Sequence, residues 1–355
     1  NPLYPVIAYQ YRLGTRARRV HGKKGSITEQ HRGHISPILA PPFSPPKRRW
    51  VDVRPYPLGK GESRGGIAPP VRIGARRQMR CYNHHLTLLT SHPLRGSSME
   101  SNILSWDQLA DWFDQKQGDE GDLWHRELIN PTLLQVLGDP AGMRVLDLAC
   151  GNGALSRRMA RMGAQVVGTD LSALLITRAQ EREAGDPLGV TYHTTNATDL
   201  VAFQDGSFDV VVCNMGAMDM PDATAQRAFQ EVARMLTGNG RFIACIPHPC
   251  FEGDETSAWV VEKVGRTTTV FRKVSRYREL YEIPNHWALA PGQYAFTVSY
   301  HRPLSWYFRA MRDAGMAVVA LEENQPTQEF IREDTEGEWI KEIPLHCVFE
   351  AVKLS

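Results

Sequence analysis

From Ser105 onward, hydrophobic and polar positions alternate between the period of an amphipathic helix and that of a strand. Trp106, Leu109, Trp112 and Phe113 form the first apolar helix face. Helices and strands then follow each other in turn, which predicts a parallel sheet with helices on both faces. The predicted helices include Leu123–Leu137, Ala154–Met162, Ser172–Ala184 (with Ser172 as N-cap), Ala223–Leu236 and Pro303–Ala314, the last ending at Gly315; the predicted strands are Arg144–Ala149, Gln165–Thr169, Val190–His193, Phe208–Asn214, Arg241–Ile246, Ala317–Leu321 and Leu345–Leu354.

The first 98 residues have no such pattern. They hold 12 of the 23 prolines, and no stretch keeps a period long enough to form a core, so we predict a disordered extension. Residues 1–99 carry 18 Lys and Arg against three acidic residues (+15), whereas residues 100–355 carry a net −13. Three interpretations of the extension stay open: a nucleic-acid-binding arm, an organellar transit peptide, or translated upstream sequence that is no functional part of the protein. Met99, directly before the first helical pattern, favours the third.

The remaining composition narrows the class of protein. No apolar run approaches the roughly 20 residues of a membrane span, and no secretory signal is evident. None of the six cysteines forms a CxxC pair, and several lie in apolar runs, as reduced buried thiols do. We therefore expect a cytoplasmic protein without a membrane segment or metal site.

The segment Val145–Gly153 carries the strongest chemical signal. It reads VLDLACGNG, an apolar strand leading into a turn of small residues and then a helix. Such a turn lets the backbone approach a ligand closely. Asp170 follows 19 residues after Gly151, at the end of the next strand, where it is placed to accept hydrogen bonds from a ribose diol.

Asp147 distinguishes between two ligands for this loop. A carboxylate beside the loop would repel the pyrophosphate of a dinucleotide, but it suits the cationic methionine end of a sulfonium ligand. Residues 153–156 also match the dinucleotide fingerprint only loosely. The pattern favours S-adenosylmethionine over NAD.

With these motifs, residues 101–355 resemble the class I S-adenosylmethionine-dependent methyltransferases, specifically the small-molecule type. Residues 147–153 match the first motif of the family in the form DxxCGxG, with Ala149 at a position that is often glycine. Residues 195–200 resemble the adenine-recognition segment, residues 208–215 the fourth-strand motif beside the transferable methyl group, and residues 238–242 the turn into the fifth strand. The resemblance implies a Rossmann-like, mostly parallel seven-stranded sheet with an antiparallel last strand. It implies S-adenosyl-L-methionine as cofactor, held by Asp147, Ala149, Gly151, Asn152, Gly153, Asp170, Leu171, Asn196, Ala197, Asn214, Met215 and Arg126.

Two further segments are expected to cover the site. Residues 251–302 form an insertion with strand-like Thr267–Tyr277 and Tyr294–Tyr300, which we interpret as a β-rich substrate lid. Its six basic residues could pair with an anionic acceptor or form a solvated strand face. Ahead of the sheet, Trp124 and Arg126 are candidates for donor contacts, and the alternative is an ordinary helix surface. The polar segment Glu322–Pro344 is expected to be a linker.

Methyl transfer from a sulfonium does not require a dedicated base, since positioning supplies much of the acceleration. His248, in a proline-framed turn after the fifth strand, and His301, before the following helix, are the candidate proton acceptors. The alternative for each is a structural hydrogen bond. The fourth strand lacks the Pro-Pro-aromatic signature of nucleobase and glutamine N-methyltransferases.

The function predicted from these observations is methyl transfer from S-adenosylmethionine to a small molecule. An RNA or protein methyltransferase using the basic extension is an alternative, although the net −13 of residues 100–355 makes nucleic acid an unfavourable partner. An NAD-dependent oxidoreductase and a non-catalytic binder are further alternatives. The sequence does not identify the acceptor or the oligomeric state.

Overall fold

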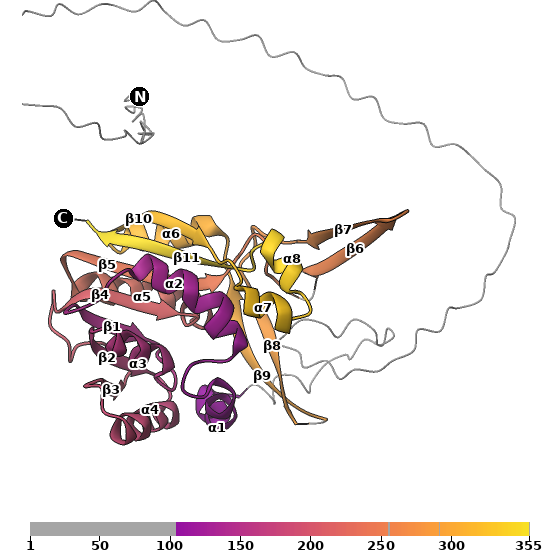
Figure 1. Cartoon of the computed structure of the whole chain (residues 1–355). Helices are drawn as coiled ribbons and strands as arrows, with labels where there is room; N and C mark the ends of the chain where they lie inside the picture. The colour runs from indigo at the N-terminus through magenta and orange to yellow at the C-terminus, as the bar shows by residue number, and fades with distance from the viewer. Residues whose placement is uncertain (1–103, 255, 291, 355) are drawn as a thin grey trace, which may run out of the picture. The chain divides into compact units, whose positions relative to one another are not determined.

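The structure is a computed structural model, and it describes residues 104–254, 256–290 and 292–354 (Figure 1). All of these belong to one compact unit of the chain, Ala75–Ser355. The predicted disorder of residues 1–98 and the three interpretations of that segment lie outside the described residues.

A seven-stranded sheet organises this unit (Figure 1). Its strand order is β10-β11-β5-β4-β1-β2-β3, and β11 runs antiparallel to both of its neighbours, while the other pairings are parallel. The Rossmann-like sheet predicted from the sequence is confirmed. The strands are β1 (Arg144–Leu148), β2 (Gln165–Asp170), β3 (Thr191–Thr194), β4 (Phe208–Asn214), β5 (Leu236–Pro247), β10 (Met316–Glu323) and β11 (His346–Lys353).

Helices cover both faces of the sheet because its central strands are apolar on both sides. Along β4, Val210 and Val212 point into one core and Val211 and Cys213 into the other, as the period of two requires. The first core is closed by α2, α3 and α4, and the second by α5 and α6. The longer helices of the unit are α1 (Trp106–Gln117), α2 (Asn130–Leu137), α3 (Ala154–Arg161), α4 (Ala173–Gly185), α5 (Asp222–Met235) and α6 (Leu304–Asp313).

Local signals set several helix boundaries. Ser172 accepts a hydrogen bond from the Leu175 amide and caps α4, as predicted. Gly315 follows α6 with φ of 85°, the left-handed conformation that ends many helices. The predicted helix Leu123–Leu137 is instead divided: a π-helical segment η2 (His125–Ile129) precedes α2. Such wide turns are rare and frequently lie at functional sites.

The insertion after β5 consists of two antiparallel hairpins, β6 (Ala258–Val264) with β7 (Thr267–Lys273) and β8 (Tyr281–Ala290) with β9 (Gln293–His301). The sequence predicted one strand of each hairpin. In Figure 1 the β8–β9 hairpin extends from the sheet toward α1. The predicted linker Glu322–Pro344 is wrong in part, because it contains two short helices, α7 (Gln328–Glu333) and α8 (Gly337–Glu342). Thr327 caps α7, and Phe330 and Ile340 anchor the two helices in a small core with Trp124.

Within the described residues, no helix combines the length and the hydropathy that a membrane crossing needs. The five cysteines in this part of the chain are free thiols.

Candidate functional site

A small cavity of about 60 Å³ opens where β1 and β4 end. The carboxyl ends of parallel strands are the usual ligand site in open α/β sheets. The first motif forms one wall of the cavity, α1 and η2 form another, and the end of β4 forms the floor. Its lining residues are Phe113, Gln117, Gly121, His125, Asn130, Asp147, Ala149, Cys150, Gly151, Asn152, Ala154, Leu155 and Asn214.

The loop after β1 is held in an unusual backbone conformation. Ala149, Gly151 and Gly153 have φ values of 61°, 55° and 80°, in the left-handed region that glycine occupies without strain. A Cβ at Gly153 would lie 2.5 Å from the Tyr192 hydroxyl oxygen, so no larger residue fits there. The loop therefore turns tightly over the sheet and exposes backbone to the cavity, as the motif predicted.

Asp170, at the end of β2, fixes this loop from the side. Its carboxylate accepts hydrogen bonds from the backbone amides of Gly151 and Ser172, both at 2.9 Å. Desolvation nevertheless raises the pKa of Asp170 above its ordinary value. A hydrogen-bonding ligand such as a ribose diol would compensate the remaining oxygen lone pairs of this carboxylate.

Asp147 lies deeper, on β1, and is almost completely buried. The Ser156 hydroxyl donates to its Oδ2 at 2.5 Å, while its Oδ1 has no hydrogen-bond partner among the described residues. Burial raises the pKa of Asp147 to about 7, and the nearby Asp170 adds to this shift. A buried carboxyl with an unsatisfied oxygen provides a favourable place for a cationic ligand group.

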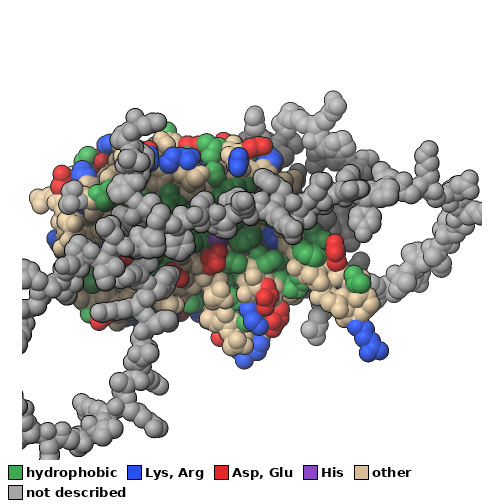
Figure 2. All heavy atoms as spheres, turned by 90° about the horizontal axis from the view of Figure 1, so that it is seen from above, with side chains coloured by type: hydrophobic (Ala, Val, Ile, Leu, Met, Phe, Trp, Pro, Cys, Tyr) green, Lys and Arg blue, Asp and Glu red, His purple; other side chains and the backbone are tan. Residues whose placement is uncertain are grey.

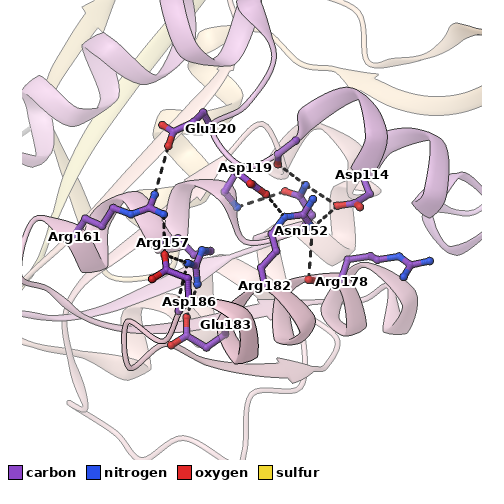
Figure 3. A network of polar contacts seen from close by, with 12 residues as sticks. Asp114, Asp119, Glu120, Asn152, Arg157, Arg161, Arg178, Arg182, Glu183 and Asp186 are labelled. Atoms are coloured by element: carbon purple, nitrogen blue, oxygen red, sulfur yellow. Dashed lines mark hydrogen bonds and ion pairs between the residues drawn. The ribbon is translucent and has the colours of Figure 1, made fainter.

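Asn152 connects the loop to the helix above it. Its amide donates to Asp114 Oδ1 at 2.9 Å and to the Gly118 carbonyl at 3.0 Å. Asp114 is also paired with Arg182 of α4 at 2.5 Å, and Figure 3 shows these side chains converging from α1, the loop and α4. The ring of Phe113 lies against Gly151. This network holds α1 as the roof of the cavity.

Besides the predicted Asn214, the cavity is lined by three residues that the sequence analysis missed, Gln117, His125 and Asn130. The Asn214 amide donates to Asn130 Oδ1 at 3.0 Å, and Asn214 Oδ1 has no partner among the described residues. His125 Nδ1 lies 3.0 Å from Asp122 and 3.1 Å from Gln117 Nε2. Asn130, His125 and Gln117 belong to no motif, and the π-helical turn that aims His125 has no clear sequence signature.

Several predicted donor contacts lie outside the cavity. The Arg126 guanidinium donates hydrogen bonds to Glu127, the Gly121 carbonyl and Glu329. The Trp124 ring packs against Phe330 and His346. These two residues hold η2 against α7.

Four further residues predicted to bind the cofactor follow the ends of β2, β3 and β4. Leu171 is 70% exposed at the rim beyond Asp170. Asn196 Oδ1 accepts hydrogen bonds from the amide and hydroxyl of Thr198, so its oxygen stabilises the turn rather than standing free for an adenine amine. Ala197 packs against the core, and Met215 has φ of 58° directly after β4. Their roles in binding stay predictions.

The two candidate histidines are not brought together and do not line the cavity. His248 Nδ1 accepts from the Cys250 amide at 3.2 Å, and its Nε2 lies 3.3 Å from Glu323. His301 Nε2 lies 3.0 Å from the Tyr277 carbonyl, and its ring stacks on Tyr281. Burial lowers the pKa of both imidazoles. These contacts correspond to the structural alternative, and a proton-transfer role stays a prediction.

The basic residues of the insertion are also largely engaged. Arg272 is buried and pairs with Glu252 at 2.8 Å, and Arg276 pairs with Asp254 and Glu279. Lys263 and Arg266 lie at the exposed end of the β6–β7 hairpin. These four side chains therefore do not form a cluster of unpaired cations that could bind an anionic acceptor.

Comparison with known proteins also indicates a methyltransferase. Residues 145–240 match the model of a methyltransferase domain family. A ubiquinone biosynthesis O-methyltransferase of Xanthomonas oryzae is 35% identical over 155 residues, which cover 42% of this chain and 62% of that protein. An uncharacterized protein of Mycobacterium tuberculosis is 38% identical over 112 residues, 32% of this chain and 40% of that protein. The matched region thus spans less than two thirds of these relatives.

Among solved structures, an S-adenosylmethionine-dependent methyltransferase from Mesorhizobium loti matches with a TM-score of 0.51 and 27% identity, covering 63% of this chain and 96% of the other. Strands β2, β3 and β4, the left-handed loop after β1 and the acidic residue that ends β2 lie in the region that the methyltransferase domain model matches. Residues 145–240 therefore belong to a methyltransferase domain family, and the fold around them is similar to that of an S-adenosylmethionine-dependent methyltransferase of known structure.

Proposed function

We propose that this protein transfers the methyl group of S-adenosylmethionine to a small-molecule acceptor. The observation that carries the proposal is the pair of desolvated carboxyls, Asp147 and Asp170, on either side of one glycine-containing loop. Such a site favours a ligand with a cationic end and a hydroxylated end. A pyrophosphate would meet two negative groups there, which argues against a dinucleotide.

The residues present fit the proposed cofactor. Asp170 would accept from the ribose hydroxyls, and Asn214 Oδ1, a buried acceptor without a partner among the described residues, would accept from the ammonium group. Asp147 would balance the positive charge from below. The loop backbone at Gly151 borders the cavity, where the ligand would lie against it. Asn152 would act indirectly, by holding the α1 roof.

When bound, S-adenosylmethionine supplies an electrophilic methyl group on a sulfonium sulfur. The contribution of the protein is to fix the acceptor in line with that group and to exclude water, which accounts for much of the acceleration in such displacements. Phe113 and the α1 roof close the cavity from one side, and the acceptor would lie at the end of β4 on the other. These elements make positioning the main task of the fold.

Two observations support a small acceptor over a nucleic acid. Residues 100–355 carry a net −13, which opposes a phosphate backbone. On the face in Figure 2, acidic and basic side chains are interspersed on the described residues where they are visible, without a continuous basic stripe. The curated Xanthomonas relative is named as an O-methyltransferase of ubiquinone biosynthesis. Oxygen of a small molecule is accordingly the acceptor atom that we favour.

The direct test is calorimetric titration of the full chain with S-adenosylmethionine, S-adenosylhomocysteine and NADH. We expect both sulfur ligands to bind and NADH not to bind. Asp170→Asn should weaken the two sulfur ligands, while Asp313→Asn, at an exposed position beyond the site, should leave them unchanged. Binding of NADH alone would refute the proposal.

A further inference from the structure

Asp219 lies beside the proposed methyl-transfer site and takes no part in the donor contacts described above. It ends η3 (Ala217–Asp219), a short turn that follows β4 directly after the cavity residue Asn214. The Trp106 indole of α1 donates a hydrogen bond to its carboxyl. The other oxygen, Oδ1, is shielded from solvent and has no partner among the described residues. A buried carboxyl with one unpaired oxygen is therefore present on the turn that follows the cavity residue Asn214.

Arg302 holds the backbone around this carboxyl without binding the carboxyl itself. Its side chain is completely buried, and its Nε donates to Asp222 Oδ1 at 2.6 Å. Its two terminal nitrogens donate to the carbonyls of Ala217 and Met220, which flank Asp219. Arg302 thus fixes η3 in place and leaves the Asp219 oxygen unpaired among the described residues.

The electrostatic environment makes Asp219 a stronger base than an exposed aspartate. Burial raises its pKa to about 8; the Trp106 hydrogen bond and the Arg302 charge oppose this shift, and the Asp170 charge adds to it. Tyr300 of β9 and Asp222 of α5 are the other titratable groups in this surrounding. A general base is most effective when its pKa lies near the working pH.

The surroundings of Asp219 are also aromatic. Trp287 of the β8–β9 hairpin lies 6.1 Å from Trp106 and 5.5 Å from Trp112, measured between ring centroids. Phe113, which lines the donor cavity, lies 5.3 Å from Trp106. A planar aromatic molecule is the ligand that such half-buried rings bind most favourably, by edge-to-face or offset contacts.

We propose that Asp219 is the catalytic residue that accepts the proton of an aromatic hydroxyl group while its oxygen is methylated. This inference rests on the proposed function and specifies its acceptor. In the step, the hydroxyl proton moves to Asp219 and the acceptor oxygen forms a bond to the methyl carbon. The carbon–sulfur bond breaks at the same time, and the sulfur keeps the electron pair as a neutral thioether. Arg302 is a positioning residue for this step.

The pH dependence follows from the ionisation of Asp219. Only the carboxylate can take the proton, so the rate should increase by about tenfold per pH unit below the pKa of Asp219 and level off above pH 8. The wild-type profile tests the inference without any substitution. A profile that is flat between pH 6 and 9 with a phenolic acceptor would contradict it.

The experiment combines donor binding with turnover. Full-length protein, Asp219→Asn and the exposed control Asp313→Asn are supplied with methyl-labelled S-adenosylmethionine and with catechol or 4-nitrocatechol as probes. We expect transfer of label, a loss of roughly 10²–10⁴-fold in kcat for Asp219→Asn, and unchanged S-adenosylhomocysteine affinity by calorimetry. Retained turnover in Asp219→Asn would overturn the role of Asp219. Donor binding without methylation of either phenol would overturn the acceptor class, and failure to bind the donor would refute the proposed function itself.

A second readout does not depend on turnover. Carboxyl-¹³C NMR of aspartate-labelled protein should show a resonance that titrates near pH 8 and disappears in Asp219→Asn. If Asp219→Asn does not fold, Asp219→Glu keeps the carboxyl and should retain the sloping pH profile at a reduced rate. Titration of the assigned Asp219 resonance near pH 4 would show that it lacks the required basicity.

Discussion

The Ser156 hydroxyl donates a 2.5 Å hydrogen bond to the buried Asp147 carboxyl, from the first turn of α3 to the middle of the sheet. The hydroxyl and the backbone amide of Ser156 are the described donors to this acid, whose Oδ1 has no partner among the described residues. Ser156→Ala should therefore raise the pKa of Asp147 further and lower the free energy of unfolding by about 1–3 kcal/mol. Chemical denaturation measures the loss. In an Asp147→Asn background the same change should cost less, and an equal cost would show that the bond is unimportant.

Asp170→Asn should weaken S-adenosylmethionine binding by roughly 10–100-fold, since a neutral amide cannot accept both the Gly151 and Ser172 amide protons as the carboxylate does. Calorimetry gives the dissociation constants. The thermal stability of the ligand-free variant should change little, because the loss of one of the two bonds is offset by removing a desolvated charge. Unchanged affinity would exclude the predicted ribose contact.

Gly153→Ala should be more destabilising than Gly142→Ala, although both glycines have a positive φ. At Gly142 a Cβ meets nothing within 4 Å, so only the backbone cost of about 1–2 kcal/mol applies. At Gly153 the new methyl group would collide with Tyr192, and we expect a further cost of about 1–3 kcal/mol. Urea unfolding of the pair separates crowding from conformation. Equal losses would mean that Tyr192 moves aside freely.

The ligand-free protein should become less stable as the pH rises from 6 to 9. The folded-state pKa values of Asp147, about 7, and Asp219, about 8, lie above the ordinary value of 3.8. Between these limits the folded state holds protons that the unfolded state has released, so stability declines with pH until the folded-state pKa is passed. Melting temperatures of Asp219→Asn should fall less steeply than those of the wild type. Parallel curves would contradict the raised pKa of Asp219.

His248→Asn should change kcat by less than about threefold, a small effect beside that of a general base. The imidazole is committed to the Cys250 amide and Glu323, and an asparagine oxygen can still accept from the former. Turnover at pH 7.5 with the same phenolic probe provides the measurement. A large loss of kcat with unchanged donor affinity would restore the histidine as a proton acceptor and weaken the argument for Asp219.

The sheet was predictable because its strands and helices depend on local patterns. The apolar runs of β1 and β4 and the serine that caps α4 each act within a few residues. The loop after β1 was predictable for the same reason. Ala149 shows the limit of the pattern, since only the structure shows that this alanine adopts the left-handed conformation of the glycine that it replaces.

The remaining parts of the site depend on contacts distant in sequence. Asn214 meets Asn130 across 84 positions, and Asn324 holds the backbone of Leu128 and Ile129 across 195 or more. No periodicity encodes such pairings. The proton-transfer role of His248 and His301 stays a prediction, because it was drawn from residue type, whereas burial and neighbouring hydrogen-bonding groups also determine it. The role that we propose for Asp219 could not be predicted from the sequence, because the desolvation that raises its pKa depends on the packing of elements distant in sequence around η3.

Helix α1 contacts both the donor cavity and the aromatic residues that we propose to bind the acceptor. Phe113 and the bond from Asn152 to Asp114 close the donor cavity, and Trp106 and Trp112 meet Trp287 of the hairpin. A movement of α1 that admits the donor must also disturb its contacts with Trp287, and thereby the proposed acceptor site. The enzyme should therefore follow a compulsory order, with the donor entering first and the demethylated product leaving last.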